Sequence, residues 1–158
     1  QRILHLDING GEPSYSKNYK RLLQNLPPNL KTLRLNTNGS VVLNDLVDVA
    51  NKGVEVTVTI SFDGVGKVHE FVRWPLKWDE FYNNLMVYKT MPVKVNLWTT
   101  VSALNIDDLE NIVEFAKQHN IDHDYAYLVY PTELRVENKD TLECQQYIQQ
   151  QMTLRKIA

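Results

Sequence analysis

Apolar residues recur along the chain in two alternating patterns: short runs typical of strands and longer amphipathic repeats typical of helices. The short runs are rich in β-branched, leucine and aromatic residues, which favour a pleated and half-buried surface. They predict strands at Ile3–Ile8, Thr32–Thr37, Glu55–Ser61, Val93–Val101 and Asp124–Tyr130. Every gap between two of these strands is long enough to hold a helix.

Each gap carries apolar residues at the spacing i, i+3, i+4, i+7, which places them on one face of a helix. Ser16 and Asn105 are predicted to cap the first and fourth helices, and Gly53 to end the second. A further, mostly polar helix is predicted over Thr141–Lys156. The four apolar sets are Tyr19, Leu22, Leu23, Leu26; Leu43, Leu46, Val47, Ala50; Trp78, Phe81, Tyr82, Leu85; and Leu109, Ile112, Val113, Ala116.

Strands that alternate with helices predict an α/β fold with parallel strands and right-handed crossovers. Two arrangements fit this alternation, an open doubly wound sheet and part of a (β/α) barrel, and composition does not separate them. We expect residues 1–131 to form the α/β core and residues 132–158 to form a linker and a C-terminal helix.

Composition removes several classes of function. The chain has 158 residues and a net charge of −2, so it lacks the basic footprint of a nucleic-acid-binding protein. No apolar run approaches the ~20 residues that a membrane helix needs, and the first residues do not form a signal peptide. The single cysteine, Cys144, cannot form an internal disulfide. We therefore expect a cytoplasmic protein with no membrane and no nucleic-acid partner.

Polar residues and glycines follow the predicted strands, where parallel α/β folds bind their ligands. Gly10 and Gly11 leave backbone groups bare, and the Glu12 carboxylate before Pro13 suits a ligand ammonium group. The later strands end in further polar residues. These are Asn36, Thr37, Asn38 and Gly39; Ser61, Asp63 and Gly64; Asn96, Thr99 and Thr100; and Tyr130 with Pro131.

At these motifs the chain resembles the radical S-adenosylmethionine (radical SAM) enzymes. Residues 10–13 match the Gly-Gly-Glu-Pro at the end of that family's second strand, and residues 36–39 match its third-strand ending. Residues 61–64 and 69–73 match the Ser-x-Asp-Gly…His-x-x-x-Arg stretch of its SPASM and twitch group. The resemblance covers most of residues 3–131 in the correct order. It implies a partial (β/α) TIM-like barrel of about five parallel strands with helices outside.

The resemblance also implies a binding site for S-adenosylmethionine. Glu12, with the backbone of Gly10 and Gly11, would hold the ammonium group of the methionyl moiety. Arg73 would pair with the carboxylate, a task that suits its planar and bidentate guanidinium. The remaining residues of the implied site would contact ribose or carboxylate oxygens, complete the motifs, or lie near the adenine. They are Ser61, Asn36 and Thr37; Pro13, Asn38 and Asp63; and Val129, Tyr130 and Pro131.

Purely structural roles, without a ligand, stay open for three residues of these motifs. Without the motif, Arg73 would be a solvated helix arginine and His69 an ordinary surface or core histidine. Asp63 would only form an Asx-type turn with Gly64.

The family's chemistry needs a [4Fe–4S] cluster held by Cys-x3-Cys-x2-Cys after the first strand. This chain has no such motif, and Cys144 is alone. The pairs His119/His123 and Asp122/Asp124 lie at the opposite ends of the strands and are not expected to bind a metal. Since the sequence opens directly on a predicted strand, we expect a piece of a longer protein whose cluster loop lies upstream. The alternative is a protein that has lost the cluster. In either case this chain alone is not expected to cleave the cofactor.

Three hypotheses about function follow. The first is an incomplete radical SAM domain, the second a cluster-free module that binds a nucleoside or amino acid without catalysis, and the third a structural α/β domain. A missing first strand would leave the edge of Ile3–Ile8 unpaired, and open apolar edges recruit other strands. We therefore expect either a homodimer through this edge or through the C-terminal helix, or cover of the edge by the helix at Thr141–Lys156.

Overall fold

The computed structural model describes residues 3–157 of the chain, in which five parallel strands form one sheet. The strand order is β1-β2-β3-β4-β5, the order of the chain itself. A doubly wound sheet reverses its order at a switch point, so that alternative is wrong and the partial barrel is confirmed. The strands are β1 His5–Ile8, β2 Thr32–Thr37, β3 Glu55–Ser61, β4 Lys94–Val101 and β5 Asp122–Tyr127.

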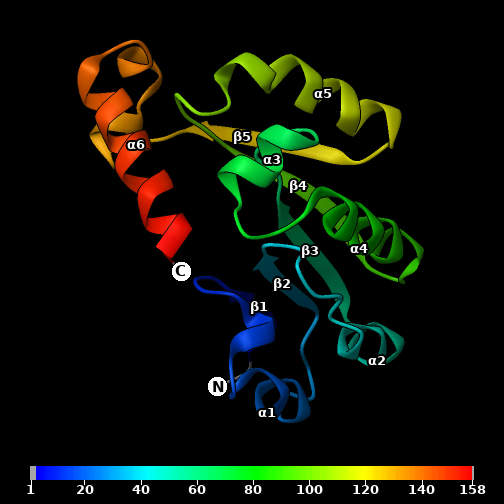
Figure 1. Cartoon of the computed structure of the whole chain (residues 1–158). Helices are drawn as coiled ribbons and strands as arrows, with labels where there is room; N and C mark the ends of the chain where they lie inside the picture. The colour runs from blue at the N-terminus through cyan, green and yellow to red at the C-terminus, as the bar shows by residue number, and fades with distance from the viewer. Residues whose placement is uncertain (1–2, 158) are drawn as a thin grey trace.

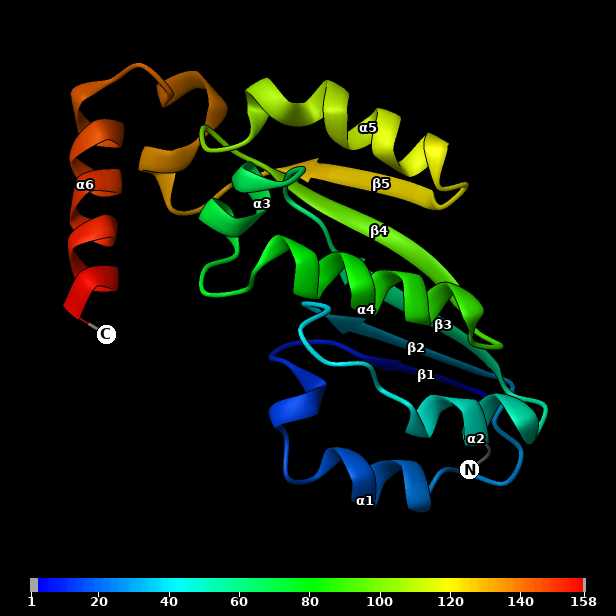
Figure 2. The same cartoon turned by 45° about the vertical axis from the view of Figure 1, so that its right-hand side comes forward.

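The helices form a layer on one face of this curved sheet. Figures 1 and 2 show α1, α2, α4 and α5 on that face, while α6 stands beyond the carboxyl ends of the strands. The helix α3 was not predicted, because six residues are too short to display a helical repeat. The helices are α1 Tyr19–Gln24, α2 Asp45–Asn51, α3 Lys67–Val72, α4 Trp78–Thr90, α5 Leu109–Gln118 and α6 Leu142–Ile157, with short 3₁₀ turns η1 Pro13–Tyr15, η2 Ile106–Asp108, η3 Thr132–Leu134 and η4 Val136–Asn138.

Two of the three predicted helix caps are wrong. Ser16 contributes only its carbonyl oxygen, which accepts from the backbone N–H of Tyr19 at 3.2 Å. The Asn105 side chain caps no helix, because its amide donates to carbonyl oxygens that follow β3 and end β4. The third cap is confirmed: Gly53 has φ 85° and its N–H donates to the Ala50 carbonyl at 2.9 Å. Only glycine adopts this φ without strain.

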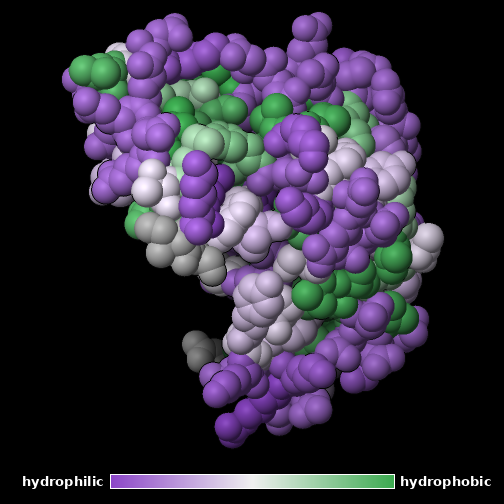
Figure 3. All heavy atoms as spheres, in the orientation of Figure 1, coloured by the Kyte–Doolittle hydropathy of each residue, from purple (hydrophilic) through white to green (hydrophobic). Residues whose placement is uncertain are grey.

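The two faces of the sheet differ in polarity because side chains alternate along each strand. The face toward the helices is apolar. Phe62, directly after β3, extends this apolar surface, and its ring stacks on that of Phe81 with 5.8 Å between the ring centres. The concave face is mostly polar and carries Arg34, Asn36, Thr57, Thr59, Ser61, Asn96, Trp98, Thr100 and Asp124, with the parallel register aligning them in rows across the strands. Figure 3 shows the surface over the helices as mostly hydrophilic, with hydrophobic residues gathered between α4 and α2.

The strands β1 and β5 are the two edges of the described sheet. The helix α6 packs mainly against η3 and reaches α3, so the predicted cover of β1 by this helix is wrong. Within residues 3–157, none of the helices combines the length and apolar character that crossing a bilayer requires.

Candidate functional site

The parallel register gathers the ends of β1, β2 and β3 at one side of the molecule, which we call the carboxyl-end rim. Asn36 on β2 donates from Nδ2 to Oδ1 of Asn9, 2.9 Å away, just after β1. The loop that follows β1 is therefore in direct contact with the end of β2, as the predicted site requires.

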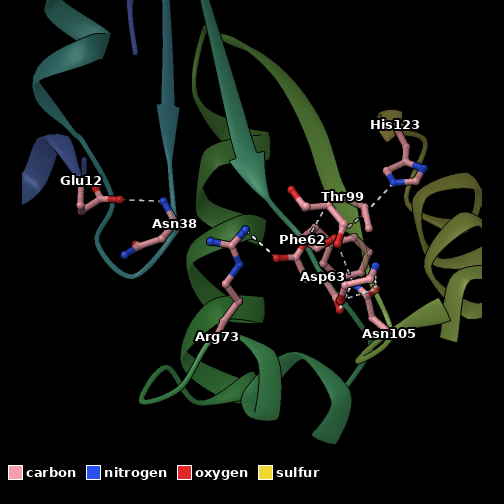
Figure 4. A network of polar contacts seen from close by, with 10 residues as sticks. Glu12, Asn38, Phe62, Asp63, Arg73, Thr99, Asn105 and His123 are labelled. Carbon is pink, nitrogen blue, oxygen red and sulfur yellow. Dashed lines mark hydrogen bonds and ion pairs between the residues drawn. The ribbon is translucent and has the colours of Figure 1, made fainter. Parts of the chain in front are cut away.

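Glu12 is the centre of the first polar cluster on this rim. Its Oε1 accepts from the Thr37 hydroxyl at 2.9 Å and from the Ser14 hydroxyl at 3.0 Å. Its Oε2 accepts from the backbone N–H of Asn38 at 2.6 Å. A carboxylate held by several donors keeps one orientation. The fold therefore brings the predicted site residues Glu12, Thr37 and Asn38 together, and Figure 4 shows the contact between Glu12 and Asn38.

The loop before Glu12 exposes its backbone. Gly10 and Gly11 have φ 90° and 63°, and a Cβ at either position would meet no atom within 4 Å. These glycines are therefore required for backbone conformation rather than for close packing, and the space beside them is open. Pro13 is buried behind the loop at the start of η1.

Asp63 and Arg73 form the second polar cluster. The Asp63 carboxylate is 3% exposed as a residue, and its Oδ2 lies 2.6 Å from Nη2 of Arg73. Its Oδ1 accepts from the backbone N–H of Thr100 at 2.8 Å. Asp63 therefore connects β4 with the end of α3. Neither of these contacts belongs to the Asx-type turn with Gly64 that was considered as the alternative. Figure 4 shows the Arg73 guanidinium pointing toward Asp63 from the end of α3.

Arg73 keeps an unused donor. Its Nε is buried and has no hydrogen-bond partner among the residues that the structure describes. A cavity of about 500 Å³ borders this side chain, and the buried Ser40 hydroxyl in its wall also lacks a partner within residues 3–157. Buried donors without partners are uncommon in folded proteins. The cavity is lined by Tyr15, Asn38, Ser40, Val72, Arg73, Trp74, Pro75, Leu76 and Glu80.

A third polar group joins β3, β4 and β5 on the helix side. The Thr99 hydroxyl donates to the Phe62 carbonyl at 2.5 Å, and it lies 2.8 Å from Nε2 of His123. Because the hydroxyl hydrogen is already used, Nε2 of His123 is the donor in the second contact. Burial lowers the pKa of His123 below its ordinary value, which keeps this ring neutral. This group braces the sheet and does not face the cavity.

The other predicted site residues lie farther away. Ser61 ends β3 on the concave face, and its side chain bonds to no described residue. Tyr130 is 80% exposed and lies with Pro131 beyond β5, at the opposite sheet edge from Glu12. The fold thus spreads the predicted residues along one rim, with the Glu12 cluster at one end and Tyr130 at the other.

Of the nine residues that line the cavity, only Asn38 and Arg73 were predicted as site residues, and the polar Ser40 and the aromatic Trp74 are among the seven that were not. Ser40 directly follows the 36–39 motif, and Trp74 directly follows Arg73. Their adjacency to the motifs was the only available signal, since neither residue belongs to a periodic pattern.

Comparison with known proteins gives the fold a reference. No family model and no curated protein matches the sequence. The structure superposes on anSMEcpe with bound AdoMet and a Kp18Cys peptide, with a TM-score of 0.62, 16% identity, and 80% of this chain aligned to 38% of that chain. It also superposes on Streptococcus suis SuiB bound to S-adenosylmethionine, with a TM-score of 0.63, 17% identity, and 94% of this chain aligned to 36% of that chain.

This chain shares its fold with proteins solved with S-adenosylmethionine bound. SuiB bound to its precursor peptide SuiA also superposes, with a TM-score of 0.56, 20% identity, and 96% of this chain aligned to 36% of that chain. The chain thus spans less than two fifths of the length of these solved proteins.

The rim fits S-adenosylmethionine and does not fit an iron–sulfur cluster. The orphaned Nε of Arg73 is a donor that a ligand carboxylate would satisfy, and Glu12 supplies a fixed negative charge for an ammonium group. In contrast, no group of three cysteine, histidine or carboxylate side chains among residues 3–157 is placed to hold a metal. Cys144 is buried on α6 and is the single cysteine of the sequence.

Proposed function

We propose that this chain is the S-adenosylmethionine-binding partial barrel of a radical SAM enzyme of the SPASM or twitch group. The observation that carries the proposal is the pair of opposite charges on the carboxyl-end rim. The Glu12 carboxylate is fixed in the loop after β1, and the Arg73 guanidinium reaches the rim from the end of α3 with its Nε unpaired among residues 3–157. The methionyl end of S-adenosylmethionine carries one ammonium and one carboxylate, the complements of these two groups.

Each residue of the rim has a specific task in this proposal. Glu12 and the bare backbone of Gly10 and Gly11 bind the ammonium group. Arg73 donates to the carboxylate from its Nε, while Asp63 holds Nη2 of the same guanidinium at 2.6 Å and so restrains its position. A donor held in advance loses little entropy when the ligand binds.

The other predicted contacts have looser tasks. Ser61 meets the ribose on the concave side, Asn36 and Thr37 support the loop, and Tyr130 with Pro131 lies near the adenine. In the radical SAM family, bound S-adenosylmethionine is the source of a 5′-deoxyadenosyl radical. The residues here orient that molecule and supply no electron.

We further propose that the cluster-binding cysteines belong to a segment outside these 158 residues. The single cysteine of the sequence and the 36–38% coverage of the solved chains support this proposal. A second candidate is a cluster-free module that binds a nucleoside or an amino acid, which the absence of a cysteine triad favours. The full gene decides between them, because an in-frame Cys-x3-Cys-x2-Cys upstream supports the first and its absence supports the second.

Calorimetric titration tests the proposed site. Wild-type protein is expected to bind S-adenosylmethionine, and the variants Glu12→Gln and Arg73→Met are each expected to lose about tenfold in affinity, the effect of one charged hydrogen bond. Binding of 5′-methylthioadenosine is expected to be equal in all three proteins, because this analogue lacks the ammonium and the carboxylate. The matched controls are Glu114→Gln on the exposed surface of α5 and Arg21→Met on α1.

Two results would contradict the site. Wild-type protein that fails to bind S-adenosylmethionine removes the proposal, and so do variants that weaken the two ligands equally, because that pattern indicates a general structural defect.

The open edge of β1 suggests an assembly. We propose that it pairs with a strand of a second copy or of a longer form of this protein, since unpaired edges recruit strands. Sedimentation of this chain at micromolar concentration is expected to show a dimer, and a monomer at all concentrations would contradict pairing between copies.

A further inference from the structure

Trp98 is an isolated aromatic ring on the polar concave face of the sheet. It lies in β4, and the residue is 39% exposed. The other two tryptophans have partners: Trp74 lies under the Arg155 guanidinium, and Trp78 packs among the aromatic rings of the core. Trp98 makes no aromatic or cation–π contact with any residue in the described part of the chain. The ring of Trp98 therefore stands alone among the mostly polar side chains of this face.

The parallel register gives Trp98 two polar neighbours. Ser61 on β3 and Asp124 on β5 are its partners in the same row, so all three side chains point to the concave side. Asp124 makes neither an ion pair nor a side-chain hydrogen bond within residues 3–157. Its neighbour on the same strand face, Asp122, is instead neutralised by Lys94 at 3.0 Å. Asp124 is therefore the unpaired carboxylate beside the ring.

We propose that Trp98 and Asp124 form a subsite that takes a cationic group of the substrate, a guanidinium or an ammonium. The face of an indole attracts a cation, and a carboxylate at its edge adds a charged hydrogen bond. The same carboxylate repels an anionic group. A neutral chain of the same length gains the contact with the ring and loses the ion pair, so the subsite selects for charge rather than for size.

The place of this subsite rests on the proposed function. Ser61 belongs to the same row and is the residue assigned to the cofactor ribose, so the cation held by Trp98 and Asp124 adjoins the cofactor on its concave side. The subsite thereby selects which substrate group is presented to the cofactor. Its chemistry can nevertheless be measured without any cofactor.

Nuclear magnetic resonance of the full chain tests the subsite directly. The indole N–H signal of Trp98, assigned by its loss in Trp98→Phe, is followed during titration with N-acetyl-arginine methylamide, spermidine and N-acetyl-norleucine methylamide. Both cationic probes are expected to shift the signal saturably, and the neutral probe to bind about fivefold or more weakly. A stronger response to the capped arginine indicates a peptide side chain, and a stronger response to spermidine indicates a free polyamine.

The variants separate a specific subsite from general surface attraction. Asp124→Asn is expected to weaken both cationic probes about fivefold without changing the norleucine probe. The matched controls are Asp79→Asn, an exposed carboxylate at the start of α4, and Tyr125→Leu, an exposed ring on the opposite face of β5. Neither control is expected to change the binding of any probe.

The outcomes also separate this inference from the proposed function. Equal shifts with arginine and norleucine probes, no saturation by either cation, or an unchanged affinity in Asp124→Asn each overturn the subsite. If the cations bind as expected while S-adenosylmethionine does not, the subsite stands and the proposed cofactor site fails. If S-adenosylmethionine binds and the cations do not, the reverse holds.

Discussion

The two charged ends of the carboxyl-end rim are built in opposite ways. The Glu12 carboxylate has most of its acceptor positions filled by the Thr37 and Ser14 hydroxyls and the backbone of Asn38. Arg73 has one strong partner, Asp63, and a buried Nε that nothing in residues 3–157 satisfies. The hydrogen bonds of the Glu12 end are mostly satisfied within the protein. The Arg73 end is held by Asp63 but keeps one donor without a partner among the described residues.

This difference indicates which end depends on packing. Glu12 is held by residues that follow β1 and β2, so its position needs little beyond the sheet itself. Arg73 sits at the end of a six-residue helix whose place depends on Gly64, His69 and contacts from α6. We expect substitutions around Arg73 to change stability more than substitutions around Glu12, and the four predictions below test this expectation.

The largest effect is expected for Asp63→Ala. Removing the carboxylate leaves the Arg73 charge partly buried without its partner and leaves the Thr100 N–H without an acceptor. We expect the free energy of unfolding to fall by about 3 kcal/mol, measured by urea denaturation. Asp79→Ala at the exposed start of α4 is the control, and it is expected to cost much less because the Asp79 side chain makes no ion pair or hydrogen bond within residues 3–157. Equal losses in the two variants would contradict this account.

The next largest change in stability is expected when the pH is lowered, because of the buried His69. This ring is 0% exposed, and neither of its nitrogens has a partner among the described residues. Burial, and secondarily the charge of Arg73, lowers the pKa of His69 from 6.5 to about 3. Since the unfolded chain takes up the proton more readily than the folded chain, this contribution to stability is complete above pH 6.5 and is lost as the pH falls toward 3.

The comparison with His69→Leu isolates this contribution. Between pH 6 and pH 4 the wild type is expected to lose about 1.4 kcal/mol per pH unit more than the variant. At pH 7 the variant is expected to be at least as stable, because it removes two unsatisfied polar atoms. Parallel stability curves for the two proteins would show that His69 does not titrate as described.

The sequence predicted the sheet more closely than the rim. The strands Thr32–Thr37 and Glu55–Ser61 were predicted to the residue, since alternation of apolar and polar positions marks both ends. The fifth strand was predicted over Asp124–Tyr130, two residues late at its start, where Asp122 and His123 are polar, and three residues late at its end. Strand periodicity thus gave reliable information wherever one face of the strand is buried.

The site was predicted as a set of residue types and not as a geometry. The motif resemblance placed Asp63 and Arg73 separately, yet they form an ion pair with each other. That pairing depends on where α3 lies, and a six-residue helix leaves no periodic signal. The Trp98 ring, the Ser40 hydroxyl and Nε of Arg73 also lack partners within residues 3–157, and this emerges only from contacts between segments far apart in the sequence, which no local pattern encodes.

Substitutions at two glycines allow a direct comparison of the Arg73 end and the Glu12 end of the rim. At Gly64 a Cβ would lie 2.6 Å from the Val68 side chain and 2.8 Å from the backbone nitrogen of His69. Gly64→Ala must therefore displace the start of α3, and we expect a loss of about 2 kcal/mol. Gly10→Ala meets no atom and carries only the strain of its φ of 90°, with an expected cost of about 1 kcal/mol. Thermal unfolding measures both, and a larger loss for Gly10→Ala would reverse the comparison.

The smallest effect is expected where α6 supports the Arg73 end. Nη1 of Arg155 donates to the Phe71 carbonyl at 2.6 Å, and its guanidinium lies 5.3 Å from the Phe71 ring centre and 5.7 Å from that of Trp74. Arg155→Met keeps most of the length of the side chain and removes the hydrogen bond and the cation–π contacts. We therefore expect the local stability of α3 to fall by about 1 kcal/mol. Hydrogen exchange of the α3 amides is expected to accelerate about fivefold, the factor that such a loss produces, while exchange in β1 and β2 stays unchanged. Lys156→Met, one residue farther along α6, is the control. If the α3 amides exchange equally in both variants, α6 does not hold this end of the rim, and the support of Arg73 reduces to its pair with Asp63.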